Sequence, residues 1–236
     1  MSDAELIAIM PVYNEEVGIT HVVSEWIQAF SREQITYRLI TINDGSTDST
    51  LSILNQLQLR TPEQLLVLSK PNSGHGRTCR LGYELALEQG AAWIFQIDSD
   101  GQCDPVYFSE FLAKRNRAHC IFGVRVTRGD GLLRRLVSRI CNVLIAIVTG
   151  QDLKDPNVPY RLIERRALEK ALQNIPEEFE LQNIALTLAL KRNQALRWAY
   201  IPIRFRAPLH AQKRMSLPKI VQMGFRMLTR LHTVKV

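Results

Sequence analysis

Apolar and polar residues alternate in blocks along the first hundred residues of the chain. Continuous apolar runs at 6–12, 37–42, 65–68 and 92–97 are typical of strands that are buried on both faces. Between these runs, apolar residues recur at helical spacing, as they do from Ile19 to Phe30. Strands and helices in this order predict an α/β fold whose sheet is mostly parallel and flanked by helices.

The second half of the chain is less regular. Its apolar runs predict three strands, and its helical spacings predict four helices. The strands are expected at 120–124, 160–163 and 196–205, and the helices at 132–149, 168–172, 178–190 and 217–231. No segment has the composition of a linker, so we expect a single domain over residues 1–236.

Clusters of polar residues follow three of the predicted strands. They lie at Tyr13–Glu16, Asp44–Asp48 and Asp98–Gln102. In sheets of this kind, ligands bind beyond the carboxyl ends of the strands, so we expect the three clusters to form one site. Ser46 or Thr47 could cap the helix that follows the second cluster.

Asp98 and Asp100 stand two residues apart in the turn after the fourth strand. Two carboxylates at this spacing can both face a hard divalent cation such as Mg²⁺ or Mn²⁺, which also binds diphosphate oxygens and water. The alternative is a solvated acidic turn or a helix cap before Pro105, and the short motif by itself favours that alternative.

The remaining motifs also allow structural interpretations. Asp44 could accept hydrogen bonds from a nucleotide base, or it could bond backbone groups in an ordinary strand-to-helix turn. The run Pro11–Glu16 is typical of a strand end with acidic residues at a helix N-terminus. In the loop 72–76, the backbone could approach a ligand, and His75 is more typical of a loop residue than of a catalytic base. The loop is not a dinucleotide fingerprint.

Taken in order, these motifs resemble one enzyme family. The segments P-V-Y-N-E-E, N-D-G-S-T-D-S-T, N-S-G-H-G-R-T-C-R and D-S-D-G-Q-C-D-P follow one another at predicted strand ends. This series resembles the family 2 inverting glycosyltransferases of the GT-A fold. The second half is similar to the polyprenyl-phosphate group of that family, to which dolichol-phosphate mannose synthase belongs, from Arg134 to Leu144 and from Asp155 to Leu162.

The resemblance implies a transferase that takes a sugar from a GDP- or UDP-linked donor, and it implies a role for each matching residue. Its nucleotide-binding residues would be Pro11, Tyr13, Glu15, Ile42, Asp44, Asp98 and Ser99. Its Mg²⁺ or Mn²⁺ ion would be held by Asp98, Asp100 and Gln102. Its candidate catalytic residues are Asp100, Arg125, which would reach phosphate, and Glu180, which would act as general base. For Glu180, an acidic residue at a helix N-terminus is the alternative.

The resemblance also divides the chain into a nucleotide-sugar-binding half, residues 1–105, and an acceptor-binding half, residues 106–236. The acceptor would be a polyprenyl phosphate, which is already anionic and needs no general base, or a glycan hydroxyl. Its phosphate would meet Arg134, Ser138, Arg206 and Arg214. A solvated helix face is the alternative for Arg134. The family segment after Pro202 departs from its usual pattern here, although the positive charge is kept.

The net charge of the chain narrows the classes of partner that it could bind. The 236 residues include 30 Lys and Arg against 23 Asp and Glu, a formal net charge of +7. This balance suggests an anionic partner. The signatures of nucleic-acid-binding folds are missing, so a nucleic-acid-binding module is only an alternative function. The basic amphipathic patterns at 132–149 and 217–231 are typical of helices that contact a membrane surface or that pack on the sheet.

Cysteine usage and the length of the apolar runs favour the cytoplasm. Cys79, Cys103, Cys120 and Cys141 form no C-x-x-C pair, which fits reduced thiols. No apolar run reaches the roughly 18 residues of a membrane-spanning helix, and no secretory signal is visible. We therefore expect a cytoplasmic enzyme, with peripheral contact at the membrane as a further hypothesis. A catalytically silent relative is the alternative, and the oligomeric state is open.

Overall fold

Strands and helices alternate in the computed structural model, which describes residues 4–127, 150, 153–176, 179 and 181–209. The strands are β1 (Leu6–Val12), β2 (Tyr37–Asp44), β3 (Leu65–Lys70), β4 (Trp93–Ile97), β5 (Cys120–Thr127), β6 (Tyr160–Glu164) and β7 (Trp198–Arg204). The helices are α1 (Ile19–Ser31), α2 (Thr50–Arg60), α3 (His75–Glu88), α4 (Phe108–Ala113), α6 (Arg165–Gln173) and α7 (Gln182–Arg192), with a 3₁₀ turn η1 (Pro105–Tyr107) before α4.

One seven-stranded sheet, in the order β3-β2-β1-β4-β6-β5-β7, forms the centre of the described part. The first four strands are parallel, as predicted. β6 runs antiparallel to both of its neighbours, and β7 is again parallel to β5. The sheet is therefore mostly parallel, and its only antiparallel strand among the described residues lies in the half where the sequence pattern is weakest.

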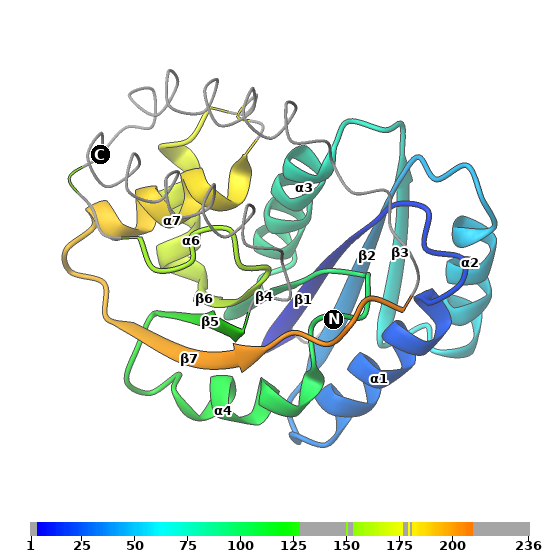
Figure 1. Cartoon of the computed structure of the whole chain (residues 1–236), viewed down its shortest axis with the longest axis horizontal. Coiled ribbons are helices and arrows are strands. Elements are labelled where there is room, and N and C mark those ends of the chain that lie inside the picture. The colour runs from blue at the N-terminus through cyan, green and yellow to red at the C-terminus, as the bar shows by residue number, and fades with distance from the viewer. Residues whose placement is uncertain (1–3, 128–149, 151–152, 177–178, 180, 210–236) are drawn as a thin grey trace.

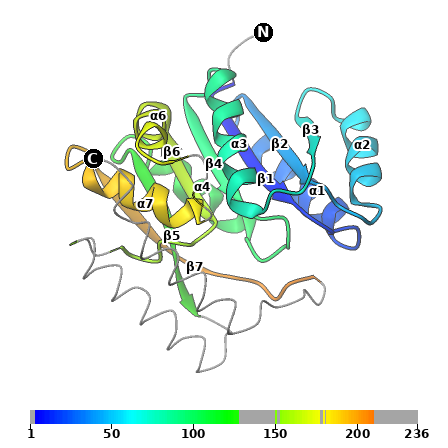
Figure 2. The same ribbon diagram turned by 90° about the horizontal axis from the view of Figure 1, so that it is seen from above.

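Helices cover both faces of this sheet, and side-chain alternation along β4 shows which helix covers which face. Phe95 packs against Trp26 of α1 and Phe108 of α4. Gln96, the next residue, points to the opposite face and bonds Tyr83 and Cys79 of α3. Figures 1 and 2 show the same arrangement, with α3, α6 and α7 on one side of the sheet and α1 and α4 on the other. A strand covered on both sides needs a continuous apolar run, which explains the sequence pattern of β1.

An aromatic cluster fixes α1 and α4 to the sheet. Trp26 lies 5.5 Å from Phe95 and 5.7 Å from Tyr160, measured between ring centroids. Phe30 lies 4.8 Å from Phe108 in an edge-to-face arrangement. All these rings are buried, and each such pair adds roughly 0.5–1.5 kcal/mol beyond its burial. The cluster ties the two helices to β4 and β6, and so supports the turn that follows β4.

All the strands predicted in the described part are confirmed, with ends within a few residues. The predicted caps of α2 are wrong. The helix begins at Thr50 with Ser49 as N-cap, and Ser46 and Thr47 bond the loop after β1 instead. The helix α4 was not predicted from the sequence, because it has only six residues. The predicted helices at 132–149 and 217–231 lie outside the described residues.

Candidate active site

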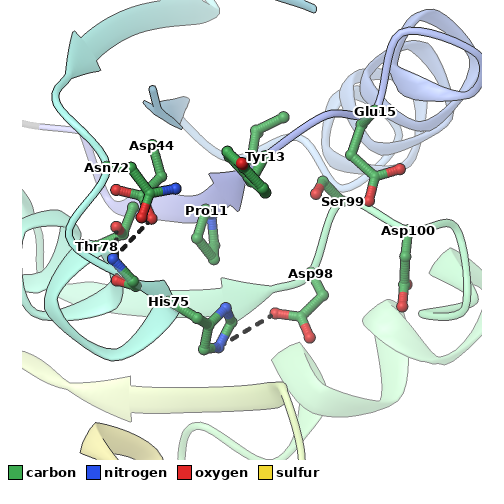
Figure 3. A pocket seen from close by; sticks show the side chains of 12 residues that line it. Pro11, Tyr13, Glu15, Asp44, Asn72, His75, Thr78, Asp98, Ser99 and Asp100 are labelled. Carbon is green, nitrogen blue, oxygen red and sulfur yellow. Dashed lines mark hydrogen bonds and ion pairs between the residues drawn. The ribbon is translucent and has the colours of Figure 1, made fainter. Parts of the chain in front are cut away.

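A polar pocket of about 280 Å³ opens at the carboxyl ends of β1, β2 and β4, where the three polar clusters meet. Figure 3 shows Asp44 at one end of it, Asp98 and Asp100 at the other, and Pro11 and Tyr13 between them. Its lining consists of Pro11, Val12, Tyr13, Glu15, Asp44, Asn72, Gly74, His75, Thr78, Asp98, Ser99 and Asp100. A larger cavity of about 480 Å³ between α6 and α7 has no carboxylate or imidazole in its lining, so it offers no comparable chemistry.

The loops after β1 and β2 are held together by bonds between side chains and backbone. The backbone N–H of Asn14 donates to Ser46 Oγ at 2.9 Å, and the N–H of Glu15 donates to the buried Thr50 Oγ1 at 2.8 Å. In return, Asn14 Oδ1 accepts from the N–H of Thr47 at 2.8 Å. Asn14 adopts a φ of 54°, a left-handed conformation that asparagine tolerates. These bonds fix Tyr13 and Glu15 at the mouth of the pocket.

Asp98 and Asp100 are the acidic end of the pocket. Burial raises the pKa of Asp98 above its ordinary value, although His75 and Arg161 act to lower it. Burial and the charge of Asp98 raise the pKa of Asp100 to about 6. Asp98 Oδ1 is buried without a hydrogen bond. Two desolvated carboxylates so close together are unfavourable without a cation, so the acidic end is built for positive charge.

His75 lies close to one of these carboxylates. It is the first residue of α3, its side chain is about half exposed, and its Nε2 lies 3.9 Å from Asp98 Oδ1 (Figure 3). Cys79, one turn further along α3, lies with its Sγ 3.4 Å from the same nitrogen. The electrostatic influence of Cys79, and then of Asp98, raises the pKa of His75. The raised pKa favours the protonated form of the imidazole, which faces the pocket.

The acidic end fits a divalent cation. A hard cation prefers carboxylate oxygens, and the unbonded Oδ1 of Asp98 offers one that has no other hydrogen-bonding partner. Among the described residues, no group of three or more His, Cys, Asp and Glu side chains converges as a ready-made metal site. The chain would therefore supply two carboxylates, and substrate oxygens and water would complete the shell.

Two residues expected in this site lie beside it. Ile42 is fully buried in β2, packs toward Gly82 of α3 and does not line the pocket. Gln102 donates its backbone N–H to Asp100 Oδ1 at 2.9 Å, while its amide Nε2 donates to the carbonyl of Arg206 at 3.4 Å. Gln102 thus orients Asp100 through its backbone.

Arg125 lies in β5, two residues before its end, outside the pocket lining and in an ion pair with Asp155. Its Nε donates to Asp155 Oδ2 at 2.8 Å and its Nη2 to Oδ1 at 2.5 Å, and its backbone N–H donates to Oδ2 at 3.1 Å. Asp155 has a φ of 43°, which is uncommon for a residue other than glycine. A β-bulge follows Arg125. These features fix the direction of the guanidinium.

Arg206 is placed on another surface. Its Nη1 donates to both carboxylate oxygens of Glu25, at 3.0 and 2.9 Å, and its Nη2 donates to Asp104 Oδ1 at 2.6 Å. Both partners line a separate cavity of about 290 Å³ beside α1. The structure therefore does not bring Arg206 together with Asp98 and Asp100, and two carboxylates already neutralise its charge.

The described part of the chain does not include every expected site residue. Arg134, Ser138, Glu180 and Arg214 lie outside the described residues. Of the site residues expected in the acceptor-binding half, the described part contains Arg125 and Arg206 alone.

The structure adds residues to the site that the sequence analysis did not assign to it. Asn72, Gly74 and Thr78 line the pocket from the loop after β3 and the first turn of α3. His75 was interpreted as a loop residue, and the structure places it in the pocket. The only signal was the glycine-bearing run N-S-G-H-G, which predicts a close backbone approach but does not say to what.

A buried arginine, to which the sequence analysis assigned no role, lies close enough to Asp98 to influence its pKa. Arg161 on β6 is fully buried, and its guanidinium donates to the carbonyls of Val158, Pro156 and Asn183. It lies 4.7 Å from the centroid of the Phe122 ring. Its charge acts to lower the pKa of Asp98, so it supports the ionised form of that carboxylate.

The sequence matches the profile of one protein family. The family described as Glycosyl transferase family 2 matches residues 7–172, more than half of the chain. All residues that line the pocket fall within the matched stretch.

Individual proteins also resemble the chain. It is 25% identical to the undecaprenyl-phosphate 4-deoxy-4-formamido-L-arabinose transferase of Edwardsiella ictaluri, over 99% of this chain and 71% of that one. The fold is similar to that of glucosyl-3-phosphoglycerate synthase from Mycobacterium tuberculosis, solved with Mn²⁺, uridine diphosphate and phosphoglyceric acid (TM-score 0.69, 18% identity, 97% of this chain and 77% of that one). It is also similar to that of mannosyl-3-phosphoglycerate synthase from Rubrobacter xylanophilus (TM-score 0.66, 12% identity, 97% and 73%). The expected GT-A fold is confirmed.

Proposed function

Since the chain belongs to glycosyl transferase family 2, we propose that it is a metal-dependent, inverting transferase that moves a sugar from a nucleoside diphosphate to a polyprenyl phosphate. That it is a glycosyltransferase follows from the family. The metal, the stereochemistry and the acceptor are the proposal. The observation that carries it is the buried, unbonded Asp98 Oδ1 in a pocket that also contains Asp44 and Tyr13.

The donor would lie along the pocket, with its base near Asp44 and its diphosphate near Asp98. Tyr13, which is about half exposed, offers a ring face for the base. The diphosphate would reach the end where Asp98 and Asp100 would hold Mg²⁺ or Mn²⁺. A cation bound there would neutralise charge on the departing nucleoside diphosphate.

His75 would act on the same charge. Its protonated imidazole faces the pocket 3.9 Å from Asp98, so it can donate a hydrogen bond to a diphosphate oxygen. The acceptor oxygen would attack the anomeric carbon from the side opposite the diphosphate, which inverts the configuration. A phosphate acceptor is already anionic, so the chain need not remove a proton from it.

The acceptor is proposed from the relatives. The Edwardsiella relative is named for undecaprenyl phosphate, and the mycobacterial structure contains phosphoglyceric acid, so both acceptors bear a phosphate. Among the described residues, no helix is long and apolar enough to cross a membrane. We propose a cytoplasmic enzyme that contacts the membrane surface peripherally to reach a lipid phosphate.

A thermal-shift panel tests the donor site. We expect one or more of UDP, GDP, CDP, dTDP and ADP to raise the melting temperature in the presence of Mn²⁺, because a ligand that binds only the folded state stabilises it. Asp98→Asn should abolish the shift. Asp104→Asn, a change outside the pocket, should keep it. No shift with any nucleotide would contradict the donor site. Transfer of labelled sugar to undecaprenyl phosphate then tests the acceptor, and transfer to phosphoglycerate alone would overturn that part.

A further inference from the structure

The segment that follows β7 lies against the turn that carries the acidic end of the pocket. We call residues 205–209 the strap, and they run from β7 toward α1 (Figure 1). The backbone N–H of Arg206 donates to the carbonyl of Gln102 at 2.9 Å, and the N–H of Leu209 donates to the carbonyl of Asp100 at 3.4 Å. Gln102 Nε2 donates back to the carbonyl of Arg206 at 3.4 Å. The strap therefore holds the backbone of the turn at two residues.

These two residues set the direction of the Asp100 carboxylate. Asp100 Oδ1 accepts from the backbone N–H of Gln102 at 2.9 Å, so the carboxylate follows the position of the Gln102 backbone. The strap bonds the carbonyl oxygens of both Asp100 and Gln102. Asp100 itself lines the pocket. Movement of the strap would therefore change the position of a carboxylate that faces the ligand.

The side chain of Leu209 packs where two glycines leave space. A Cβ on Gly101 would lie 2.8 Å from Leu209 Cδ1, and a Cβ on Gly18 would lie 3.0 Å from the same atom. Gly101 belongs to the turn and has a φ of 77°, which favours glycine, and Gly18 directly precedes α1. Leu209 thus packs between the turn and the start of α1.

The other end of the strap is fixed as well. Arg206 Nη1 donates to both carboxylate oxygens of Glu25 in α1, at 3.0 and 2.9 Å. The ring centroid of Phe205 lies 5.4 Å from the guanidinium carbon of Arg125. The guanidinium of Arg206 does not line the pocket, so its effect on a ligand must pass through the backbone of the strap.

We propose that Arg206 and Leu209 are positioning residues of the cation site, which hold the turn so that the Asp100 carboxylate is directed into the pocket before a cation binds. The inference rests on the proposed function, in which Asp98 and Asp100 would bind Mg²⁺ or Mn²⁺. A site that is fixed in advance loses less freedom on binding, which raises its affinity. Residues that orient metal ligands typically contribute about 10- to 100-fold to metal affinity.

Calorimetric titration of the full chain with Mn²⁺ tests the role of Leu209. It is done with Mn²⁺ alone and again with the nucleotide that gives the largest thermal shift. Leu209→Ala should bind Mn²⁺ roughly tenfold more weakly than wild type, because the turn loses its contact with the strap. Leu209→Met, which refills the same space, should stay within about threefold. Leu59→Ala, on an exposed position of α2, is the matched control and should bind as wild type does.

The melting temperature without metal separates positioning from a merely structural role. Leu209 is 45% exposed, so we expect Leu209→Ala to melt within about 2 °C of wild type. A lower melting temperature with unchanged Mn²⁺ affinity would overturn the positioning role. Wild-type affinity in a folded Leu209→Ala protein would do the same, and both results would leave the proposed function intact. A wild-type protein that binds no Mn²⁺ under either condition would overturn both proposals.

Arg206→Gln tests the other end of the strap independently, and it decides the question if Leu209→Ala does not fold. Glutamine cannot form the ion pair with Glu25, so the strap is released from α1 and Mn²⁺ binding should weaken by about tenfold. Arg60→Gln, at the exposed end of α2, should bind as wild type does. A role of Arg206 in holding a phosphate would leave the affinity for Mn²⁺ alone unchanged, and that result would overturn the inference.

Discussion

At the scale of single residues, the main feature of the site is a pair of carboxylates, Asp98 and Asp100, whose charged forms are disfavoured by burial. Burial and the neighbouring Asp98 raise the pKa of Asp100 to about 6, against 3.8 in an unfolded chain. The folded protein therefore holds a proton that the unfolded chain releases between those two pH values. This group favours the folded state at low pH, and its contribution is lost as the pH rises through 6.

Asp100→Asn should consequently stabilise the metal-free protein at neutral pH. The amide removes a buried charge that costs up to about 3 kcal/mol when ionised, so we expect a higher free energy of unfolding at about pH 7.5 and little change at about pH 4. Urea unfolding in the presence of a chelator measures this. Equal effects at both pH values would show that the carboxyl is not desolvated in the folded state.

At the scale of elements, the pocket depends on loops that hold one another in place. The loop after β1 contributes Tyr13, the loop after β2 begins directly behind Asp44, and neither loop contains regular structure. Their geometry comes from bonds between side chains and backbone, among which the bond from the Glu15 N–H to Thr50 Oγ1 is buried. A buried donor without an acceptor lowers the free energy of unfolding by roughly 1–3 kcal/mol. These few contacts therefore contribute substantially to the stability of the loops.

Thr50→Val should therefore destabilise the protein by about 1–3 kcal/mol, because valine has the same shape but leaves the Glu15 N–H without its acceptor. Chemical denaturation measures the change. Thr47→Val is the matched control, since Thr47 is exposed and its hydroxyl bonds Asn14 only weakly, at 3.4 Å. It should stay within about 0.5 kcal/mol of wild type. Equal losses in the two variants would contradict the importance of the buried bond.

At the scale of the whole molecule, one sheet joins the two halves of the chain. β4, which is followed directly by Asp98, pairs with β6, which carries Arg161. Arg161 in turn donates a hydrogen bond to the carbonyl of Asn183 in α7. The donor pocket is thus packed against the half in which we expect the acceptor. The chain as a whole carries a formal net charge of +7, which favours an anionic surface.

Peripheral membrane contact is testable on the intact chain. We expect it to float with vesicles that contain anionic lipid at low salt and to be released at about 0.5 M salt, where charges more than a few ångströms apart are screened. Vesicles of zwitterionic lipid alone are the control and should bind much less. A chain that stays entirely in the soluble fraction at low salt would rule out the electrostatic contact.

The sequence by itself determined the first four strands and the position of their polar ends. Buried parallel strands need continuous apolar runs, and parallel strands end at a common edge, so the sequence alone assigns Tyr13, Asp44 and Asp98 to one place. These local patterns predict most of the residues that line the polar pocket. Local patterns do not predict that His75 belongs to the pocket, because nothing in its own segment indicates that it faces Asp98.

Only the tertiary structure decided which partners the charged groups have. Arg206 is neutralised by Glu25, a residue 181 positions away in the chain, and Arg125 by Asp155. The same holds for the strand β6, whose antiparallel direction depends on how the chain returns to the sheet. Whether a charge is free for a ligand depends on contacts between distant segments, whereas periodicity and motifs report only on neighbours along the chain.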